Sequence, residues 1–598
     1  MTAPEVTPEV PAAELLAQHF DEAFSAPDGI TRLRELILTL AMQGKLVEQD
    51  PSEGTAAELL EQIAAEKKRL VKEGKIKAPK ALPPVEDAEK PYELPQGWAW
   101  VRLGDVTEII RGITFPGSEK SSIPSPGMIA CLRTANVQKE IDWDDLIFVD
   151  RKFVGKESQL IRLNDIVMSM ANSRELVGKC ALVRETPVDA AFGGFLGVIR
   201  PFVIDPNYLI QILMTGYARA TLVDSATQTT NIANVSLGKL NPFLLPLPPL
   251  AEQRRIVARI DQLMARCDEL EALREQQEAK RVQAHRAVLR EVTAASDPAA
   301  FAEGWRFLAD HFGELHATPK DLAELRGAIL QLAVMGKLVP QDASEGTAAE
   351  LLEQIAAEKK RLVKEGKIKA PKALPPVEDA EKPYELPQGW AWVRLGDVTE
   401  IIRGITFPGS EKSSIPSPGM IACLRTANVQ KEIDWDDLIF VDRKFVGKES
   451  QLIRLNDIVM SMANSRELVG KCALVRETPV DAAFGGFLGV IRPFVIDPNY
   501  LIQILMTGYA RATLVDSATQ TTNIANVSLG KLNPFLLPLP PLAEQRRIVA
   551  KVDQLMGLCD VLQERLTAQG IKQGQLLGAV MAQLAPSVAV GRPAATAG

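Results

Sequence analysis

Four polar stretches of the sequence carry side chains that hydrogen-bond readily to the edges of DNA bases. They are IIRGITF (109–115), LRTANVQ (132–138), SMANSREL (169–176) and SATQTTNIANVSLGK (225–239). Arginine can pair with guanine, asparagine or glutamine with adenine, and serine or threonine with either. The alternative is a set of ordinary polar turns, which commonly contain Asn, Thr and Gly. The candidate base-contacting residues are Arg111, Thr114, Arg133, Thr134, Asn136, Ser169, Asn172, Arg174, Lys179, Gln228, Thr229, Thr230, Asn231 and Asn234.

Catalytic signatures are missing from the sequence. No Gly-Lys pair is followed by Ser or Thr, so there is no GxxxxGK[ST] phosphate-binding loop. The stretch LNPFLL (240–245) only resembles the Asn-Pro-Pro-aromatic loop of amino-methyltransferases. No histidine lies between Trp98 and Leu245, and Asp144 with Asp145 is typical of a solvated turn. Because sparse carboxylates can form a metal-dependent nuclease site, a nuclease or methyltransferase acting alone remains one alternative.

Composition and charge set limits on the partners of the chain. A length of 598 residues suggests about four domains. Its six cysteines form no CxxC motif, which predicts reduced thiols and neither disulfides nor a metal site. The N-terminal stretch resembles no signal peptide and no apolar run is long enough to span a membrane, so we expect a cytoplasmic protein. Net charge is −8, and residues 96–245 carry 15 basic and 15 acidic side chains. Any affinity for phosphates must therefore be local or come from a partner.

The chain is a tandem duplication with an offset of 292 residues. The 207 residues from Ser52 to Ala258 are identical to those from Ser344 to Ala550. This repeat is far longer than a solenoid unit, so it predicts two multi-domain halves. Even the solvated run AAEKKRLVKEGKIK is unchanged, which indicates recent copying or construction, and identity alone does not mark functional residues. The second set of candidate residues is Arg403, Thr406, Arg425, Thr426, Asn428, Ser461, Asn464, Arg466, Lys471, Gln520, Thr521, Thr522, Asn523 and Asn526.

Each half has the pattern of helices, then a globular domain, then a long helix. Helices are predicted at 13–24, 31–43 and Thr55–Glu73, followed by a Pro- and charge-rich linker. From Trp98 to about Leu245, short β-type runs alternate with turn residues, and one helix is predicted over Pro206–Ala220. This pattern predicts a mixed α/β domain of about 150 residues.

The stretch PLPPLAEQRRIVA closes each globular domain, at 246–258 and 538–550. Its prolines should end the strand ladder and start a helix. The helices predicted from Ala251 to about Val292 and from Ala543 to about Ala585 carry narrow apolar seams typical of coiled coils. We expect the two seams to pair with each other; the alternative is that each packs on its own domain. The stretch AASDP (294–298) should end the first long helix. The seam residues are Ile256, Ile260, Leu263, Cys267 and Leu270, and Ile548, Val552, Leu555, Cys559, Leu562 and Leu566.

The sequence resembles the specificity (S) subunits of type I restriction–modification enzymes over nearly its whole length. LPQGWAWVRLGDV (94–106) is similar to the start of a target recognition domain of that family. LPLPPLAEQRRIVARIDQL (245–263) is similar to its end and to the long helix that follows. LRGAILQLAVMGKLVPQD (325–342) is similar to the family's other shared helical segment.

The resemblance implies an α+β fold with two target recognition domains separated by long antiparallel coiled-coil helices and related by a pseudo-twofold axis. It implies that the chain is non-catalytic and binds double-stranded DNA. Two methyltransferase (M) subunits would bring S-adenosylmethionine and methylate adenine, and R subunits, where present, would use ATP and Mg. The domains would be a helical region and linker (1–94), recognition domains (95–245 and 387–537), a central helical spacer with its linker (246–386) and a C-terminal helical spacer (538–598).

In one respect the sequence departs from the family, whose two recognition domains usually differ. Here they are identical, so they should bind the same bases on opposite strands, and we expect an interrupted palindrome as target. An interpretation from a different class of protein is a coiled-coil scaffold that displays two protein-binding domains and does not bind DNA. A basic surface on the globular domains would argue against the scaffold, and an acidic one would favour it.

Overall fold

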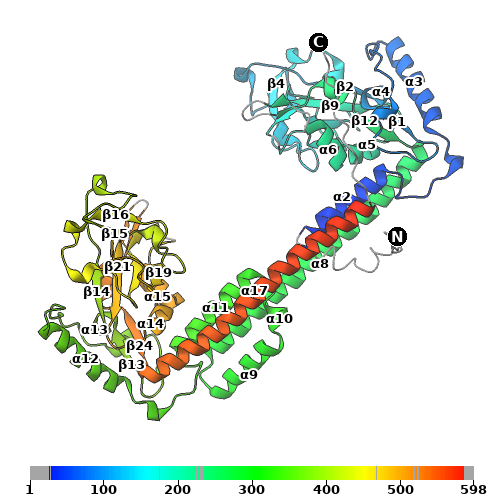
Figure 1. Cartoon of the computed structure of the whole chain (residues 1–598). Helices are drawn as coiled ribbons and strands as arrows, with labels where there is room; N and C mark the ends of the chain where they lie inside the picture. The colour runs from blue at the N-terminus through cyan, green and yellow to red at the C-terminus, as the bar shows by residue number, and fades with distance from the viewer. Residues whose placement is uncertain are drawn as a thin grey trace, which may run out of the picture. The chain divides into compact units, whose positions relative to one another are not determined.

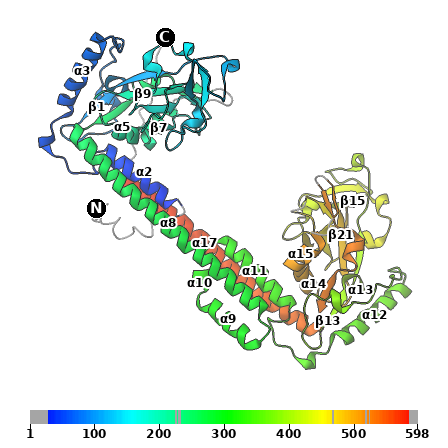
Figure 2. The same cartoon turned by 180° about the vertical axis from the view of Figure 1, so that it is seen from behind.

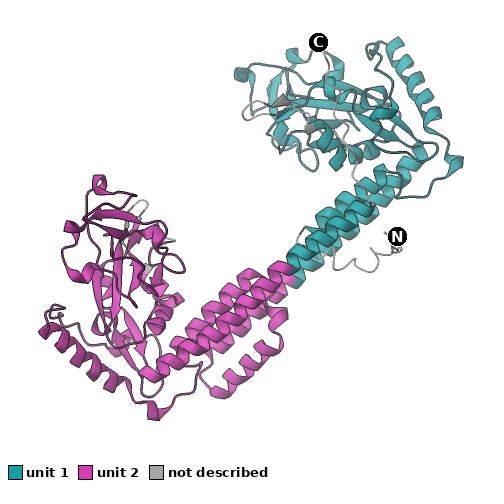
Figure 3. Cartoon of the chain, in the orientation of Figure 1, with its two compact units in different colours: residues 1–277, 569–598 teal, residues 278–568 magenta. Residues whose placement is uncertain are grey.

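The computed structural model describes residues 26, 28–173, 175–223, 227–228, 233–465, 468–515, 519–521 and 524–584. The chain forms two compact units (Figure 3), one of residues 1–277 and 569–598 and the other of residues 278–568. Each unit contains one globular domain with helices, and the two long helices Leu250–Ala294 and Leu542–Leu584 each contribute to both units (Figure 1). The predicted helix at 13–24 lies outside the described residues.

The globular domain of the first unit consists of short strands and short helices. Its strands are β1 (Ala99–Arg102), β2 (Thr107–Arg111), β3 (Met128–Leu132), β4 (Ile147–Asp150), β5 (Ile166–Ser169), β6 (Ala171–Asn172), β7 (Cys180–Leu182), β8 (Ala190–Phe192), β9 (Leu196–Pro201), β10 (Thr227–Gln228), β11 (Ala233–Asn234) and β12 (Leu244–Leu247). Its helices are α4 (Leu103–Val106), α5 (Pro206–Leu213), α6 (Gly216–Val223) and α7 (Leu237–Leu240).

The second globular domain repeats this order of elements. Its strands are β13 (Ala391–Arg394), β14 (Thr399–Arg403), β15 (Met420–Leu424), β16 (Ile439–Asp442), β17 (Ile458–Ser461), β18 (Ala463–Asn464), β19 (Cys472–Leu474), β20 (Ala482–Phe484), β21 (Leu488–Pro493), β22 (Thr519–Thr521), β23 (Ile524–Asn526) and β24 (Leu536–Leu539). Its helices are α13 (Leu395–Val398), α14 (Pro498–Leu505), α15 (Gly508–Val515) and α16 (Leu529–Leu532).

Four small sheets form the first globular domain. Their strand orders are β2-β9-β5-β7, β4-β3-β8, β10-β11-β6 and β1-β12, and the second domain has the equivalent four. All pairings are antiparallel except β3 with β8. The long β2–β9 ladder, in which Ile109 faces Ile199, joins the beginning of the domain to its later part.

The four-stranded sheet is covered on both faces, which explains the uninterrupted apolar run Ile166–Met168 of β5. In β5, Ile166 and Met168 belong to one apolar cluster, whereas Val167 between them belongs to another. Successive side chains of a strand point to opposite faces of a sheet, so an apolar residue is needed at every position. Cys180 is buried in one of these clusters and Cys131 in a separate cluster at β3, and burial raises the pKa of both thiols to about 12.

One predicted helix of the domain proved to be two. The predicted helix over 206–220 is interrupted between α5 and α6 at Met214 and Thr215. The buried Thr215 hydroxyl donates to the Ile212 carbonyl (2.7 Å) and accepts from the Ala218 N–H (3.2 Å). This side chain therefore hydrogen-bonds to a carbonyl at the end of one helix and to an N–H at the start of the next. Such a side-chain bond competes with the continuous backbone ladder of a helix, and helical periodicity does not reveal it.

Pro246 corrects a second prediction, because it lies inside a strand. It pairs with Trp100 in the two-stranded sheet of β1 and β12. A proline is tolerated in a sheet at an edge, where its missing N–H costs no ladder hydrogen bond. Its carbonyl accepts a hydrogen bond of 2.9 Å from the hydroxyl of the buried Tyr208.

Most of the helical predictions outside the domains agree with the structure. The helices are α2 (Gly29–Met42), α3 (Ala56–Lys72), α8 (Leu250–Ala294), α9 (Pro298–Asp310), α10 (Phe312–Leu315), α11 (Pro319–Val334), α12 (Ala348–Lys364) and α17 (Leu542–Leu584). The predicted end of the first long helix is confirmed. Asp297 caps the Ala300 N–H (3.2 Å), and Pro298 occupies the first turn of α9.

The predicted pairing of the two apolar seams with each other was wrong for the first unit. Ile256, Ile260 and Cys267 of α8 are buried in a cluster with residues of α2 and of the globular domain, and Leu270 is exposed. The last turns of α17 also lie in this unit, where Leu577 packs against Leu36 of α2. The α8 seam has its apolar partner in α2 instead.

In the second unit, α11 packs beside the long helices, as α2 does in the first unit. Arg281 and Arg286 of α8 pair with Asp321 and Glu324 of α11, and Arg326 of α11 pairs with Asp560 of α17. Farther along, Gln341 just beyond α11 donates to Glu544 of α17. In this unit α17 therefore runs antiparallel to α11 and to the end of α8; the three lie side by side in Figure 1 and Figure 2.

Buried polar side chains fasten the first globular domain to α8. Gln253 is fully buried; its Oε1 accepts from the Asp205 N–H and its Nε2 donates to the Pro248 carbonyl, each at 2.9 Å. The neighbouring Glu252 accepts hydrogen bonds from Trp98 Nε1 (2.9 Å) and Gln49 Nε2 (3.0 Å). The AEQRR part of the repeated stretch is thus the joint between domain and helix.

Replacing Gln253 and Gln545 by leucine should destabilise both joints. The change keeps the approximate size of the side chain but leaves a buried N–H and a buried carbonyl unpaired at each joint, which costs about 1–3 kcal/mol per joint. Urea unfolding of the full chain should show the loss. The matched control is Arg254→Leu with Arg546→Leu, since these neighbours are exposed. Equal stability of the Gln253/Gln545 variant and the control would contradict the assigned role.

Candidate nucleic-acid interface

A cavity of about 750 Å³ in the first domain collects predicted residues from three separate parts of the sequence. Arg111 ends β2 and Thr114 lies just beyond it, Arg133 and Thr134 follow β3, and Asn234 ends β11. The second domain has the equivalent cavity, of about 690 Å³. The structure thus brings together five of the predicted residues in each domain: Arg111, Thr114, Arg133, Thr134 and Asn234, and Arg403, Thr406, Arg425, Thr426 and Asn526.

Close backbone packing brings these segments together. A Cβ on Gly112 would collide with the Phe192 and Gly193 carbonyl oxygens, so only glycine allows the chain after β2 to approach the end of β8. The Ile113 N–H then donates to the Phe192 carbonyl (2.8 Å), and the Gly193 N–H to the Leu132 carbonyl (2.9 Å). The ends of three strands therefore meet at one wall of the cavity.

Arg133 is held in place before any ligand binds. Its Nη2 donates to the carboxylate of Asp145 (2.6 Å) and to the backbone carbonyl of the same residue (3.0 Å). A guanidinium has five N–H donors in a planar fork, so such a side chain can keep this anchor and still present donors to a ligand. Arg111, which lines the same cavity, is exposed.

Asn136 and Asn428 were predicted to contact bases, and the structure corrects this prediction. Asn136 is fully buried: its Nδ2 donates to the Asp142 and Asp145 carbonyls (3.0 and 2.9 Å), and its Oδ1 accepts from the Arg133 N–H (2.8 Å). Asn428 makes the same contacts in the second domain. The side-chain amide therefore forms its hydrogen bonds within the loop that carries Arg133 and fixes the shape of that loop.

Ser169 and Ser461 need the same correction, because both are buried, at 1% exposure. Asn172 is half-buried and donates weakly to Ser169 Oγ (3.4 Å), as Asn464 does to Ser461. Lys179 donates to Gln138 Oε1 (2.7 Å), as Lys471 does to Gln430. The remaining predicted residues lie outside the described residues or have undescribed side chains: Arg174, Gln228, Thr229, Thr230 and Asn231, and Arg466, Gln520, Thr521, Thr522 and Asn523.

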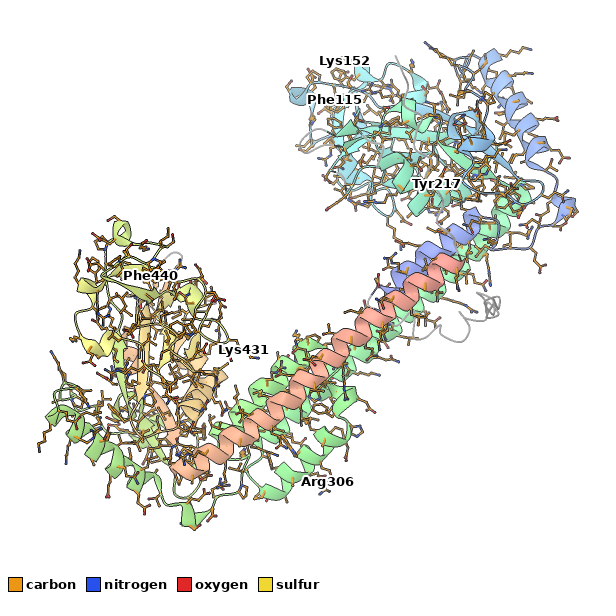
Figure 4. The ribbon with its side chains drawn as sticks, in the orientation of Figure 1. Phe115, Lys152, Tyr217, Arg306, Lys431 and Phe440 are labelled. Atoms are coloured by element: carbon orange, nitrogen blue, oxygen red, sulfur yellow. The ribbon has the colours of Figure 1, made fainter. Side chains whose placement is uncertain are left out.

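Sequence reasoning missed several residues of the cavity. Phe115, Lys120 and Phe195 line it with the predicted residues. Figure 4 shows Phe115 at the end of the domain away from Tyr217, which lies on the side near α2 and α8. The signal for Phe195 was available, since an apolar ring in the tight turn GGFLG between two strands has no obvious place in the core.

A basic groove continues from this cavity. It has a volume of about 1680 Å³ and lies between α3 with its linker on one side and β2 on the other. Arg111, Leu237 and Gly238 line both the cavity and the groove. Seven basic and three acidic side chains line the groove, as in the second domain: Lys67, Lys75, Lys77, Lys80, Arg111, Lys156 and Arg162 against Glu73, Glu108 and Glu157.

The basic residues of the groove differ in how much they support the fold. Lys67 donates to the Asp105 carbonyl (3.1 Å) and lies over the Phe202 ring, and burial lowers the pKa of its ammonium group. Lys77 and Lys80 of the linker are exposed. With the lysines of α3 and its linker, the groove beside the charge-balanced domain thus has a local basic excess, the kind of surface that attracts phosphates.

The comparisons with known proteins agree with this architecture. The family model described as "Type I restriction modification DNA specificity domain" matches the chain twice, over residues 95–281 and 387–569. The fold and the paired cavities therefore define a class of protein, one with a duplicated DNA specificity domain. In the part of the chain that the structure describes, no helix is long and apolar enough to cross a membrane.

Full-length relatives identify the family. The specificity subunit of the type I restriction enzyme EcoAI from Escherichia coli is 34% identical over 579 residues, with 92% of each chain covered. That of EcoEI, also from Escherichia coli, is 32% identical over 558 residues, again with 92% of each covered. The HsdS subunit crystal structure from Thermoanaerobacter tengcongensis has a TM-score of 0.42 at 21% identity, covering 83% of this chain and 99% of that one. The chain belongs to the type I restriction enzyme specificity subunits, the non-catalytic DNA-recognition chains of these systems.

Replacing Asn136 and Asn428 by alanine should change stability and not target choice. Each substitution removes the hydrogen bonds that the amide makes with the Arg133 or Arg425 N–H and with the Asp142 or Asp434 carbonyl, which costs about 1–3 kcal/mol per domain. Chemical denaturation of the full chain should show this cost, while the methylated DNA motif should stay the same. The matched control is Thr134→Ala with Thr426→Ala. These residues are in the same loops as Asn136 and Asn428 but line the cavities, so the control separates a change of the cavity lining from the loss of the buried amide. A changed motif at unchanged stability would return Asn136 to the base-contacting set.

Proposed function

We propose that each globular domain binds one half of a bipartite double-stranded DNA target, with base edges at the cavity and phosphates along the basic groove. The observation that carries the proposal is the continuity of the two, since Arg111 lines both. Hydrogen bonds from Arg111, Arg133 and Asn234 would select bases, whereas Lys77 and Lys80 would hold the backbone. The basic surface argues against a scaffold that binds only proteins.

The catalytic steps would belong to partner subunits. Two M subunits would bind the helical regions, supply S-adenosylmethionine and methylate adenine in each half-site. R subunits, where present, would add ATP- and Mg-dependent translocation and cleavage. We place the recognition domains at 95–245 and 387–537, between the helical regions 1–94, 246–386 and 538–598, and the complex in the cytoplasm.

The identity of the two domains bears on the form of the target. The same side chains in both cavities should select the same bases. Two equal half-sites can form a direct repeat or, when they are on opposite strands, an interrupted palindrome. We propose the palindrome, because the two halves of a duplicated DNA-binding protein commonly bind as a twofold pair.

Methyladenine mapping of the genome in cells that express this chain with its M subunit tests the proposed function. The expected result is one interrupted palindrome that is methylated on both strands. Cells with the M subunit alone are the control. A motif with unlike halves would refute the equal half-sites, and the absence of any motif despite an assembled, active complex would refute the DNA-recognition role.

Neutralising the groove should weaken DNA binding without changing the motif. The variant replaces Lys77, Lys80, Lys369 and Lys372 by glutamine. Removal of each lysine–phosphate ion pair should reduce the slope of log K against log salt by about 0.9. The salt dependence of DNA binding by the assembled complex measures this slope. The matched control replaces Lys68, Lys72, Lys360 and Lys364, which lie on α3 and α12 but outside the groove linings. Equal slopes for both variants would remove the groove from the interface.

A further inference from the structure

Phe195 is one of the most exposed large apolar side chains of the first domain. It is 68% exposed, whereas its neighbours Phe192 and Leu196 are completely or almost completely buried. Phe487, its counterpart in the second domain, is 66% exposed. Both rings line the cavities that contain the candidate base-contacting residues.

The backbone that carries Phe195 is tied down on both sides. Its carbonyl accepts hydrogen bonds from the Met170 N–H (2.8 Å) and the Ala171 N–H (3.3 Å). The next residue, Leu196, donates its N–H to the Gly193 carbonyl (2.8 Å). The turn therefore holds the ring at the cavity surface, and the ring cannot reach the core without breaking these bonds.

The surroundings of the ring combine apolar surface with hydrogen-bond donors. Gly194 lies next to the methyl group of Thr114, and Arg111 and Arg133 belong to the same cavity lining. A ligand for such a site needs a flat apolar face or a methyl group beside hydrogen-bond acceptors, and a DNA base has these features. A phosphate or sugar would use the arginines but gain nothing from an exposed ring.

We propose that Phe195 and Phe487 make the apolar base contact of each half-site, either with the face of a base or with a thymine methyl group. This inference rests on the proposed function, because it names side chains that would act within the same interface. The ring adds affinity for the correct bases by burial, while the arginines and Asn234 supply the directional hydrogen bonds.

The test replaces Phe195 and Phe487 by alanine in the assembled complex with M subunits. Specific DNA binding should weaken roughly 10- to 100-fold per domain, the loss expected when a buried phenylalanine contact disappears. Binding to DNA without the target, and its salt dependence, should stay the same. The matched control is Leu163→Ala with Leu455→Ala, because these side chains are 57% exposed but lie outside the cavity linings.

Two modified DNA targets distinguish the two forms of contact. Uracil in place of thymine removes the methyl group, so a methyl contact predicts that wild-type affinity falls while the alanine variant is indifferent. With 2-aminopurine in the half-site, a stacked ring predicts a change of fluorescence that the alanine variant does not cause. A response of the wild-type complex that the alanine variant lacks, in either experiment, supports the proposal, and the absence of such a difference in both experiments overturns it.

Other outcomes separate this inference from the proposed function. If the wild-type complex binds its target and the alanine variant binds equally well, the role of the ring is wrong and the interface stands. If the alanine variant no longer assembles with M subunits in size-exclusion chromatography, the ring belongs to a protein contact and the proposal fails. If the assembled wild-type complex does not bind DNA, the proposed function itself fails.

Discussion

The buried amide of Gln253 is the contact on which the arrangement of each unit depends. It lies at the start of α8 and hydrogen-bonds to the segment before α5 and to the proline turn after β12. Together with Glu252 and Arg255, it ties the last strand, the long helix and the segment after α2 to one another. A base-contacting surface has to be held at a fixed position relative to the helices, and buried, directional hydrogen bonds provide this rigidity.

The cavity depends on a different kind of contact, the close approach of backbone to backbone. Glycine at 112 lets the chain after β2 lie against Gly193, and the buried Asn136 shapes the loop that presents Arg133. The residues that form the site therefore divide into two groups. Residues of the first group, such as Asn136 and Ser169, are buried and support the surface from below. Residues of the second group, such as Arg111 and Phe195, are exposed on the surface.

The distribution of charged side chains is consistent with the proposed DNA-binding role of this specificity subunit. The charges of residues 96–245 balance, yet α3 and the linker outside that range contribute Lys67, Lys75 and Lys80 to a groove beside the cavity. A partner subunit is thus not the only source of basic surface. In the proposed interface, α3 and its linker would bind DNA together with the globular domain.

The sequence by itself determined the duplication, the order of the elements and the family. An offset of 292 residues, the Thr55 cap of α3, the break near Pro298 and the alternation of short apolar strands with turns are local features, visible in neighbouring residues. Five of the predicted polar residues of each domain also meet in the cavity, because they all lie at or just beyond strand ends.

Only the tertiary structure decided which side chains are available. Asn136 and Arg133 are three residues apart and both are polar, but one is surrounded by carbonyl groups and the other lines the cavity. The partner of the α8 seam was decided in the same way, since α2 packs against that seam through Ile30 and Ile37 and against α17 through Leu36. Burial and hydrogen-bond satisfaction depend on residues distant in the chain, and hydrophobic periodicity carries no information about them.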